Sequence, residues 1–237
     1  MANPKRRLRV IAVGDTHFPW VDRAKLKTVL ETIRKVQPDA VVQMGDLYDF
    51  YSFSRYPRSL DVTTPKDEAK KGRKQAVEFW EAVQAAAPRA KCYQLLGNHD
   101  DRVLKLAINK APELASLLNG GVDERLDVGH LWRFPGVTTQ PDSRTELVLD
   151  GVVYMHGYRS RLGDHMRYNQ QSTVVGHSHK GGVIYERNVK GPIFELNAGY
   201  LAHERSPVMA YTQQRKCDRV PGYGVIDENG ARFIPLG

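Results

Sequence analysis

Five short apolar segments of this chain end in the same way, with a glycine beside an aspartate, an asparagine or a histidine. In open α/β sheets, ligands bind in the crevice formed by the loops at the carboxyl ends of the strands. Glycine lets the backbone turn sharply there and come close to a ligand. We therefore expect the five loops to converge on one crevice of an α/β fold. The five endings are Gly14-Asp15-Thr16-His17, Gly45-Asp46-Leu47-Tyr48-Asp49, Gly97-Asn98-His99-Asp100, His156-Gly157 and Gly176-His177-Ser178-His179.

The Asp, Asn and His side chains of these loops offer oxygen and imidazole nitrogen atoms to a ligand, with no thiolate among them. This set of donors suits divalent ions such as Mn²⁺, Fe²⁺ and Zn²⁺. Each loop alone is weak evidence, because an Asp-x-His sequence also occurs in ordinary surface loops. Five such loops in order favour a metal centre over five unrelated turns.

Hydrophobic periodicity predicts alternating strands and helices in the first half of the chain and a second half richer in strands. Thr64 is the expected N-cap of a long helix that has Pro65 at its first position. Asp150-Gly151 and Asn229-Gly230 are hairpin signals. The expected helices cover residues 22–36, 64–87 and, more weakly, 101–108 and 112–118. The expected strands cover residues 8–13, 40–44, 91–96, 146–149, 152–155, 173–175, 183–187, 193–197, 224–227 and 231–234.

The whole chain, residues 1–237, is expected to form a single domain, because 237 residues with 41% hydrophobic content can bury a substantial core. Its core is expected over about residues 8–200, with a C-terminal β-hairpin extension. No apolar run approaches the roughly 20 residues that span a bilayer, and the basic N-terminus leads straight into a predicted strand. Cys92 and Cys217 are far apart and are expected to be free thiols in a reducing compartment. We therefore expect a cytoplasmic protein with no membrane partner.

The net charge of +8 favours anionic partners such as phosphates, nucleotides or nucleic acid, although it also serves solubility alone. The runs Lys5-Arg6-Arg7 and Lys70-Lys71-Gly72-Arg73-Lys74 are expected to be solvated faces.

The ordered loops resemble the calcineurin-like metallophosphoesterase superfamily, whose pattern is D-x-H, G-D-x-x-D, G-N-H-[D/E], H and G-H-x-H. All five blocks occur in order between Asp15 and His179, and Asn197-Ala198-Gly199-Tyr200 is similar to the segment that often follows them. The resemblance covers roughly residues 8–200. It implies a four-layer α/β/β/α sandwich of two mixed β-sheets flanked by helices, with a two-metal site.

The resemblance also implies a role for each ligand. One ion is held by Asp15, His17 and His179, the second by Asn98, His156 and His177, and Asp46 bridges the two. Because strand side chains alternate, His177 and His179 are expected to point the same way, each toward a different ion. The expected cofactor is two Mn²⁺ ions, with Fe²⁺, Zn²⁺ or Ni²⁺ as alternatives, and the implied nucleophile is a hydroxide that bridges the two metals.

His99 follows a predicted ligand and is the candidate that protonates the leaving oxygen. Asp49 is expected to orient His99 and raise its pKa, as in the phosphatase branch of the family; the alternative for Asp49 is a loop cap. Asp100 is expected to be structural, capping the helix that begins there. The sequence contains no nucleophilic serine or cysteine motif that competes with this interpretation.

One position departs from the family. The protein-phosphatase branch has a phosphate-binding arginine after G-D-x-x-D, where this chain has Phe50. Close kinship to Ser/Thr phosphatases therefore stays open. Four arginines are candidates to replace it: Arg55, Arg102, Arg159 and Arg161.

Five aromatic residues lie between positions 48 and 56, directly after the predicted bridging ligand. Phe50 and Tyr51, with Arg55, are candidates for a wall on which a nucleobase stacks; the alternative is a loop that buries its rings. Arg159 and Arg161 are candidates for a second wall, or belong to a solvated basic helix.

The sequence thus predicts a hydrolase of phosphomonoesters or phosphodiesters, nucleotides included. Two alternatives remain: a DNA or RNA nuclease with the same chemistry, and a non-catalytic binding scaffold.

Overall fold

The computed structural model describes residues 7–54, 63–113, 118, 128–210 and 219–237, and the elements there follow the predicted alternation. The first half contains β1 (Val10–Val13), α1 (Arg23–Val36), β2 (Ala40–Gln43), the 3₁₀ turn η1 (Tyr51–Phe53), α2 (Pro65–Ala86), β3 (Lys91–Gln94), α3 (Arg102–Lys110), η2 (Val128–Trp132) and β4 (Val137–Thr139). The second half contains β5 (Leu147–Leu149), β6 (Val152–Tyr154), α5 (Asp164–Asn169), β7 (Thr173–Val175), β8 (Gly182–Asn188), β9 (Gly191–Asn197), α6 (Pro207–Ala210), β10 (Gly222–Asp227) and β11 (Gly230–Pro235).

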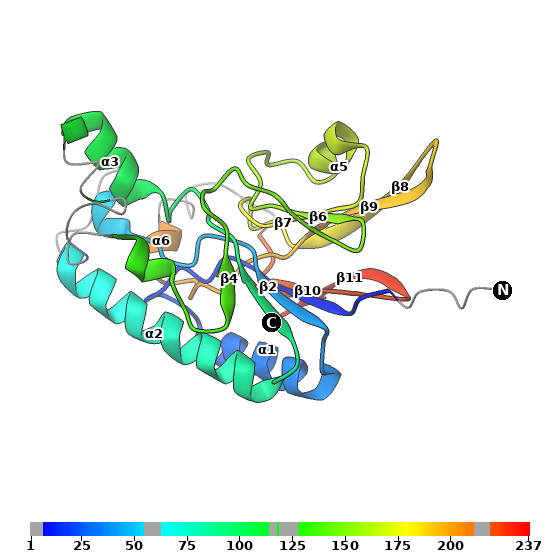
Figure 1. Ribbon diagram of the computed structural model, residues 1–237, viewed down its shortest axis with the longest axis horizontal. Coiled ribbons are helices and arrows are strands. Elements are labelled where there is room, and N and C mark those ends of the chain that lie inside the picture. Colours follow the sequence, from blue (N-terminus) through cyan, green and yellow to red (C-terminus); the bar gives the residue numbers. More distant parts are fainter. Residues whose placement is uncertain (1–6, 55–62, 114–117, 119–127, 211–218) are drawn as a thin grey trace.

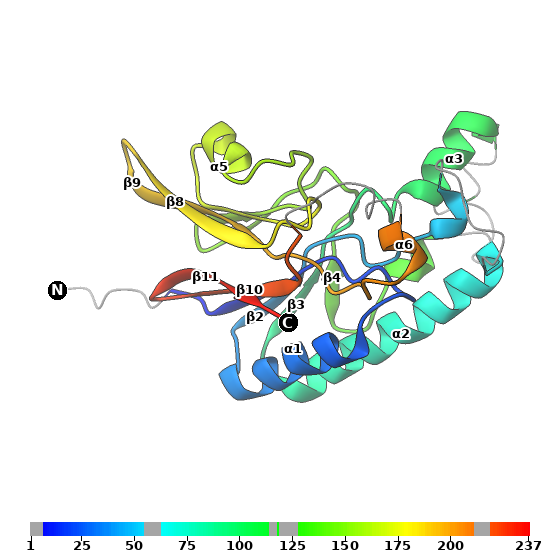
Figure 2. The same ribbon diagram turned by 180° about the vertical axis from the view of Figure 1, so that it is seen from behind.

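Over the described residues these strands form two mixed sheets, one above the other (Figures 1 and 2). The first has the order β11-β10-β1-β2-β3-β4, and the second has the order β5-β6-β7-β9-β8. Helices α1 and α2 cover the outer face of the first sheet, and the short α5 lies over the outer face of the second. The predicted α/β architecture of two mixed sheets flanked by helices is confirmed.

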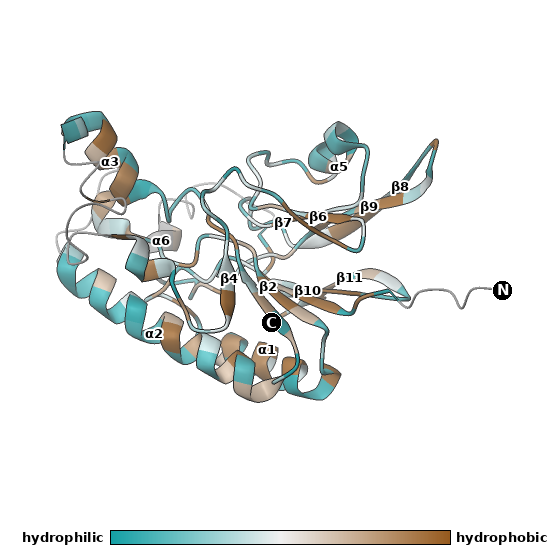
Figure 3. Ribbon diagram, in the orientation of Figure 1, coloured by the Kyte–Doolittle hydropathy of each residue, from teal (hydrophilic) through white to brown (hydrophobic). Residues whose placement is uncertain are grey.

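Alternation along β1 divides the core into two layers. Val10 and Ala12 face the second sheet, whereas Ile11 and Val13 pack with Val29 and other side chains of the helix layer. Figure 3 shows the result: the strands are mostly apolar, and the helices are polar on their outer surfaces.

Both long helices begin where the sequence signals predict. The Asp22 carboxylate accepts hydrogen bonds from the backbone N–H groups of Ala24 and Lys25 at the start of α1. At the start of α2, Thr64 accepts from the N–H of Asp67, and Pro65 occupies the first helical position. Among the described helices, none is both long and apolar enough to cross a membrane.

Parallel pairing brings the functional loops to one edge. Strands β1, β2 and β3 are parallel neighbours, as are β6, β7 and β9, so their carboxyl ends lie together. The C-terminal hairpin of β10 and β11 pairs antiparallel with β1. The hairpin is therefore an integral part of the first sheet.

Candidate metal centre

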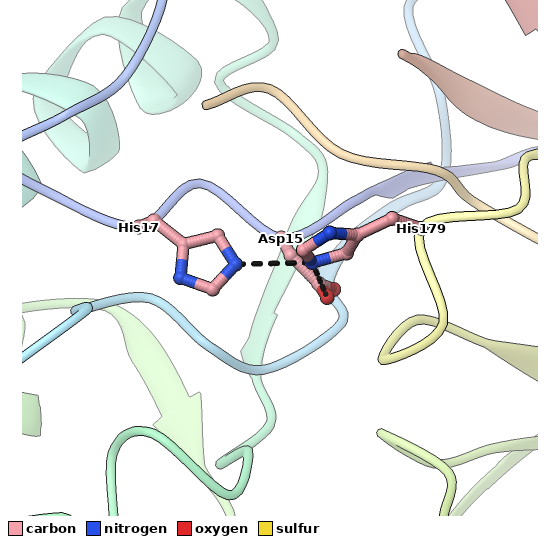
Figure 4. Close-up of side chains that lie close together, drawn as sticks. All are labelled: Asp15, His17 and His179. Carbon is pink, nitrogen blue, oxygen red and sulfur yellow. Dashed lines mark hydrogen bonds and ion pairs between the residues drawn. The ribbon is translucent and has the colours of Figure 1, made fainter. Parts of the chain in front are cut away.

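Three of the predicted ligands form a compact group at the ends of β1 and β7 (Figure 4). His17 Nε2 lies 3.1 Å from His179 Nε2, and His179 Nε2 lies 3.0 Å from Asp15 Oδ2. The second oxygen, Asp15 Oδ1, is buried and has no hydrogen-bond partner among the described residues. Two converging imidazole nitrogens beside an unsatisfied carboxylate oxygen fit a divalent cation.

The second predicted group lies beside the first. Asn98 Oδ1 is 2.8 Å from His177 Nδ1 and 3.1 Å from His156 Nε2. Asp46 Oδ2 lies 3.4 Å from the same nitrogen of His156. Asp15, Asp46 and His156 each offer an atom within 4.8 Å of the others, which places Asp46 between the groups. The structure thus brings all seven sequence-predicted ligands close together.

Four of these residues have left-handed backbone conformations, which are uncommon for residues other than glycine. The φ angles are 49° at His17, 50° at Asp46, 64° at His177 and 59° at His179. The strand alternation expected for His177 and His179 is therefore wrong, because both lie beyond the end of β7 in a tight loop. Such conformations cluster at functional sites, where the surrounding structure holds them in place.

Two glycines are required by close approach. A Cβ atom at Gly97 would lie 2.1 Å from Asp46 Oδ1, and one at Gly176 would lie 2.3 Å from Asp15 Oδ1. These glycines leave room for the carboxylates of the site.

Burial and neighbouring charges shift the pKa values of the site residues in different directions. Burial lowers the pKa of His177 to about 4 and that of His179 to about 3, so both imidazoles are neutral at pH 7 and ready to bind a cation. Burial also acts to lower the pKa of His156, but the carboxylate of Asp46 outweighs it and raises that pKa to about 10. Burial raises the pKa of Asp15 to about 6.

Asp49 contacts two histidines with one oxygen. Its Oδ1 lies 3.0 Å from His17 Nδ1 and 2.7 Å from His99 Nδ1. Burial acts to raise the pKa of Asp49, but the neighbouring His99 and His17 outweigh it and hold that pKa well below its usual range. Burial acts to lower the pKa of His99, but the carboxylates of Asp46 and Asp49 outweigh it and raise that pKa. Asp49 is therefore placed to orient both a predicted ligand and the predicted acid.

Asp100 does not cap the helix that follows it, contrary to the sequence prediction. Its buried carboxylate accepts backbone hydrogen bonds from Gly97, Leu47 and Tyr48, at 2.8, 3.2 and 3.0 Å. The N-cap of α3 is Asp101, whose side chain makes no capping bond. Asp100 instead ties together the loops that follow β2 and β3.

A cleft of about 530 Å³ opens over the site. Its floor contains Asp46, Asn98, His177 and His179, with His99 beside them. Its wall is formed by η1 and α3 and contains Phe53, Ser54, Arg102, Lys105, Leu106 and Asn109.

Arg102 is the candidate arginine that reaches this cleft. Its Nη1 donates to the Asp49 carbonyl oxygen and its Nη2 donates to His99 Nε2, both at 2.8 Å. Arg159 instead stacks its guanidinium over the ring of Tyr158 at 5.2 Å, away from the cleft lining. Arg161 is exposed and does not line the cleft either, and Arg55 lies outside the described residues.

The predicted stacking wall of Phe50 and Tyr51 is not formed by those rings. Phe50 is 1% exposed and packs against Tyr48 and Trp132, and Tyr51 is 7% exposed. A left-handed φ of 50° at Phe50 turns this segment, so that its ring enters the core. The aromatic ring of the segment that reaches the cleft is that of Phe53, within the part of the chain that the structure describes.

The sequence analysis included Phe53 among the five aromatic residues without singling it out, and it missed Lys105, Leu106 and Asn109 as cleft residues. A signal was present for the last three. With Arg102, they have the i, i+3, i+4, i+7 spacing of one helix face directly after the G-N-H-D block.

The profile of the calcineurin-like phosphoesterases matches residues 8–192, and the chain belongs to this family. Phosphoesterases are hydrolases of phosphoester bonds, so the predicted class is confirmed at the level of the family.

Two phage proteins are similar in sequence. The Gene 54 protein of Mycobacterium phage D29 is 28% identical over 187 residues, which cover 74% of this chain and 70% of that protein. The Gene 54 protein of Mycobacterium phage L5 is 25% identical over 188 residues, with the same coverage of 74% and 70%.

Two solved structures are similar in outline. Yfce, a phosphoesterase from E. coli, aligns over 93% of this chain and 89% of its own, with 17% identity and a TM-score of 0.44. Vacuolar Protein Sorting 29 from Cryptosporidium parvum aligns over 98% of each chain, with 14% identity and a TM-score of 0.43.

Proposed function

We propose that the protein is a metal-dependent phosphoesterase that hydrolyses small phosphomonoesters or phosphodiesters, nucleotides included, with two divalent ions. The observation that carries this proposal is that seven donor side chains lie close together around the floor of the cleft, five of them buried and Asn98 and His177 partly exposed. Asp15, His17 and His179 would hold one ion; Asn98, His156 and His177 would hold the other; and Asp46 would bridge them.

When bound, two such ions supply an activated water and neutralise charge on the phosphate oxygens. Mn²⁺ is the ion we propose first, and Fe²⁺, Zn²⁺ or Ni²⁺ suit the same nitrogen and oxygen donors.

The chain's own residues bind the phosphate and move a proton. Arg102 presents its guanidinium at the cleft beside His99, where it can donate to the phosphate oxygens. Asp49 accepts a hydrogen bond from His99 Nδ1, which leaves Nε2 to face the cleft. When Arg102 moves from this nitrogen to the phosphate, Nε2 can take up a proton from solvent, which the raised pKa of His99 favours, and then give it to the leaving oxygen.

The test is hydrolysis of p-nitrophenyl phosphate and bis-p-nitrophenyl phosphate by the Mn²⁺-loaded protein. We expect turnover of at least one ester, lost in Asp46→Ala and kept in Asp142→Asn, an exposed control whose turn an asparagine can also form. Turnover that persists in Asp46→Ala would contradict the proposal, because the bridging position would then be dispensable.

A nuclease with the same chemistry is the second candidate, and the net charge of +8 favours it. Cleavage of a labelled oligonucleotide at rates above those for small esters would support it. The scaffold alternative requires that no Mn²⁺, Fe²⁺ or Zn²⁺ bind after reconstitution, and the complete set of seven donors speaks against that.

A further inference from the structure

We propose that the cleft-facing side of α3, together with Phe53, forms a subsite for the nucleobase of a mononucleotide substrate. The inference rests on the proposed phosphoesterase function and names the substrate class of that same site.

Four side chains of α3 line the cleft: Arg102, Lys105, Leu106 and Asn109. Their spacing places them along a single face of the helix. Arg102 is the member that touches His99 at the metal centre. Asn109 lies seven residues further on, which is about 10 Å along the helix axis at 1.5 Å per residue. The helix therefore forms a wall that runs from the reacting phosphate toward the outside, and it projects from the sheets in Figure 1.

The order of chemistry along this wall matches the order within a nucleotide. The cation of Arg102 stands where the phosphate binds, and the amide of Asn109 comes last. Between them lie the apolar side chain of Leu106 and Lys105, whose ammonium group is paired with Asp101 at 3.1 Å. Phe53, which is half-buried, adds an aromatic ring from η1 to the same cleft. Proteins recognise bases by stacking on aromatic rings and by hydrogen bonds to base edges. An asparagine amide offers both a donor and an acceptor for such an edge.

Within the described part of the chain, the apolar part of the wall is exposed to solvent. Helix α3 has no buried residue, and Leu106 is 44% exposed although it faces the cleft. An amphipathic helix in a globular domain normally buries its apolar stripe against the core. A flat base between Leu106 and Phe53 would remove that stripe from water. A sugar phosphate offers hydroxyl groups, for which this apolar stretch is poorly suited.

The turn η1, which carries Phe53, is held in place by a buried side chain. The buried carboxylate of Glu68 accepts from the backbone N–H groups of Tyr51 and Ser52, at 2.6 and 2.9 Å. The rings of Phe53 and Phe50 also form a T-shaped pair, with ring centres 5.9 Å apart. Phe53 is thus presented by an anchored turn, which lowers the entropic cost of binding a base.

The test is isothermal titration calorimetry of the Mn²⁺-loaded protein with non-hydrolysable phosphonate analogues of adenosine, guanosine, cytidine and uridine 5′-monophosphates, and with inorganic phosphate as the base-free ligand. We expect at least one nucleotide to bind about tenfold tighter than phosphate, consistent with the worth of base stacking. In Leu106→Ala, Phe53→Leu and Asn109→Ala proteins, we expect weaker nucleotide binding, by about threefold to tenfold, and unchanged phosphate binding.

Ile108→Ala is the matched control, because Ile108 lies on α3, is 51% exposed and does not line the cleft. We expect it to leave both affinities unchanged, and thermal denaturation of all four variants checks that they are folded. Equal affinity for nucleotides and phosphate, or equal losses of both in the cleft variants, would overturn the subsite. A single-stranded tetranucleotide that binds more tightly than every mononucleotide would also overturn it, in favour of a strand-binding groove.

The binding and hydrolysis measurements distinguish failure of the subsite proposal from failure of the proposed function. Base-dependent binding without ester hydrolysis would retain the subsite and contradict the proposed function. Ester hydrolysis without base-dependent binding would retain the proposed function and contradict the subsite.

Discussion

At the scale of single residues, Asp49 contacts both a residue proposed for metal binding and a residue proposed for proton transfer. One oxygen contacts His17, which is a proposed metal ligand, and His99, which is the proposed acid. Partners that orient a metal ligand commonly affect metal affinity as well as activity. The two histidines therefore allow the two effects to be separated.

We predict that His99→Gln lowers kcat by about 10²–10⁴-fold and leaves the metal content unchanged, because it removes only proton transfer. Asp49→Asn should lower kcat and also weaken metal binding by about tenfold to a hundredfold, because it releases His17. Steady-state kinetics and elemental analysis measure the two effects. Equal metal affinity in Asp49→Asn and the unchanged protein would show that the contact with His17 has no effect.

The raised pKa of His156 leads to a prediction of how metal binding depends on pH. In the metal-free protein, burial opposes protonation of His156, but the carboxylate of Asp46 outweighs it and raises its pKa to about 10. A cation binds only the neutral imidazole, so it must displace this proton at pH 7. Raising the pH removes the competing proton, and Mn²⁺ affinity should therefore increase, up to about tenfold per pH unit between pH 7 and 9.

Calorimetric Mn²⁺ titrations at pH 7, 8 and 9, in buffers with different heats of ionisation, measure both affinity and proton release. The slope should flatten in His156→Asn, which has no proton to displace. An affinity that is independent of pH in the unchanged protein, without proton release, would contradict the account.

At the scale of elements, Asp100 connects two loops that carry ligands. Its carboxylate accepts from three backbone N–H groups, at Leu47, Tyr48 and Gly97. We predict that Asp100→Asn lowers the free energy of unfolding by about 1–3 kcal/mol, because an amide leaves at least one buried N–H unsatisfied. Urea denaturation of the metal-free protein measures this, with Asp142→Asn as the exposed control. A loss no larger than that of the control would contradict the role of Asp100 as a tie between the loops.

The elements that the sequence predicted well are those with local signals. The Thr64-Pro65 start and the β-branched runs depend on neighbouring residues alone, and α2 begins as expected. Strand β4 was missed because its three residues, Val137–Thr139, are too few to show a periodicity. The partners of β10 and β11 could not be predicted either, because pairing with β1 joins residues about 200 positions apart in the chain.

The site was predicted in its composition but not in all of its geometry. The seven proposed ligands could be selected from the sequence because each stands in a short contiguous motif with glycine. The direction of the Phe50 ring was not predicted, because a single left-handed residue redirects a side chain without changing the periodicity of the sequence. The cleft residues of α3 lay in a helical pattern that was weaker than those of α1 and α2, and no cleft role was assigned to it.

At the scale of the whole molecule, the site joins the two sheets through buried acidic groups. Asp15 and Asp46 are almost completely buried, and Asp15 Oδ1 has no hydrogen-bond partner among the described residues. Leaving such groups without a cation reduces stability. Bound metal should therefore stabilise the fold, by about 4 kcal/mol at a free concentration 1,000 times the dissociation constant.

We predict that a chelator lowers the melting temperature of the loaded protein and that Mn²⁺ restores it. In Asp46→Asn the shift should be much smaller, because the bridging charge is lost. Differential scanning calorimetry measures both; a chelator that shifts the two proteins equally would point to metal bound elsewhere.

The most direct measurement of the central claim is anomalous X-ray diffraction from crystals grown with Mn²⁺. The account predicts two manganese peaks in the cleft, one in contact with Asp15, His17 and His179, the other with Asn98, His156 and His177, and both touching Asp46. A single peak, or peaks outside this cluster, would contradict it.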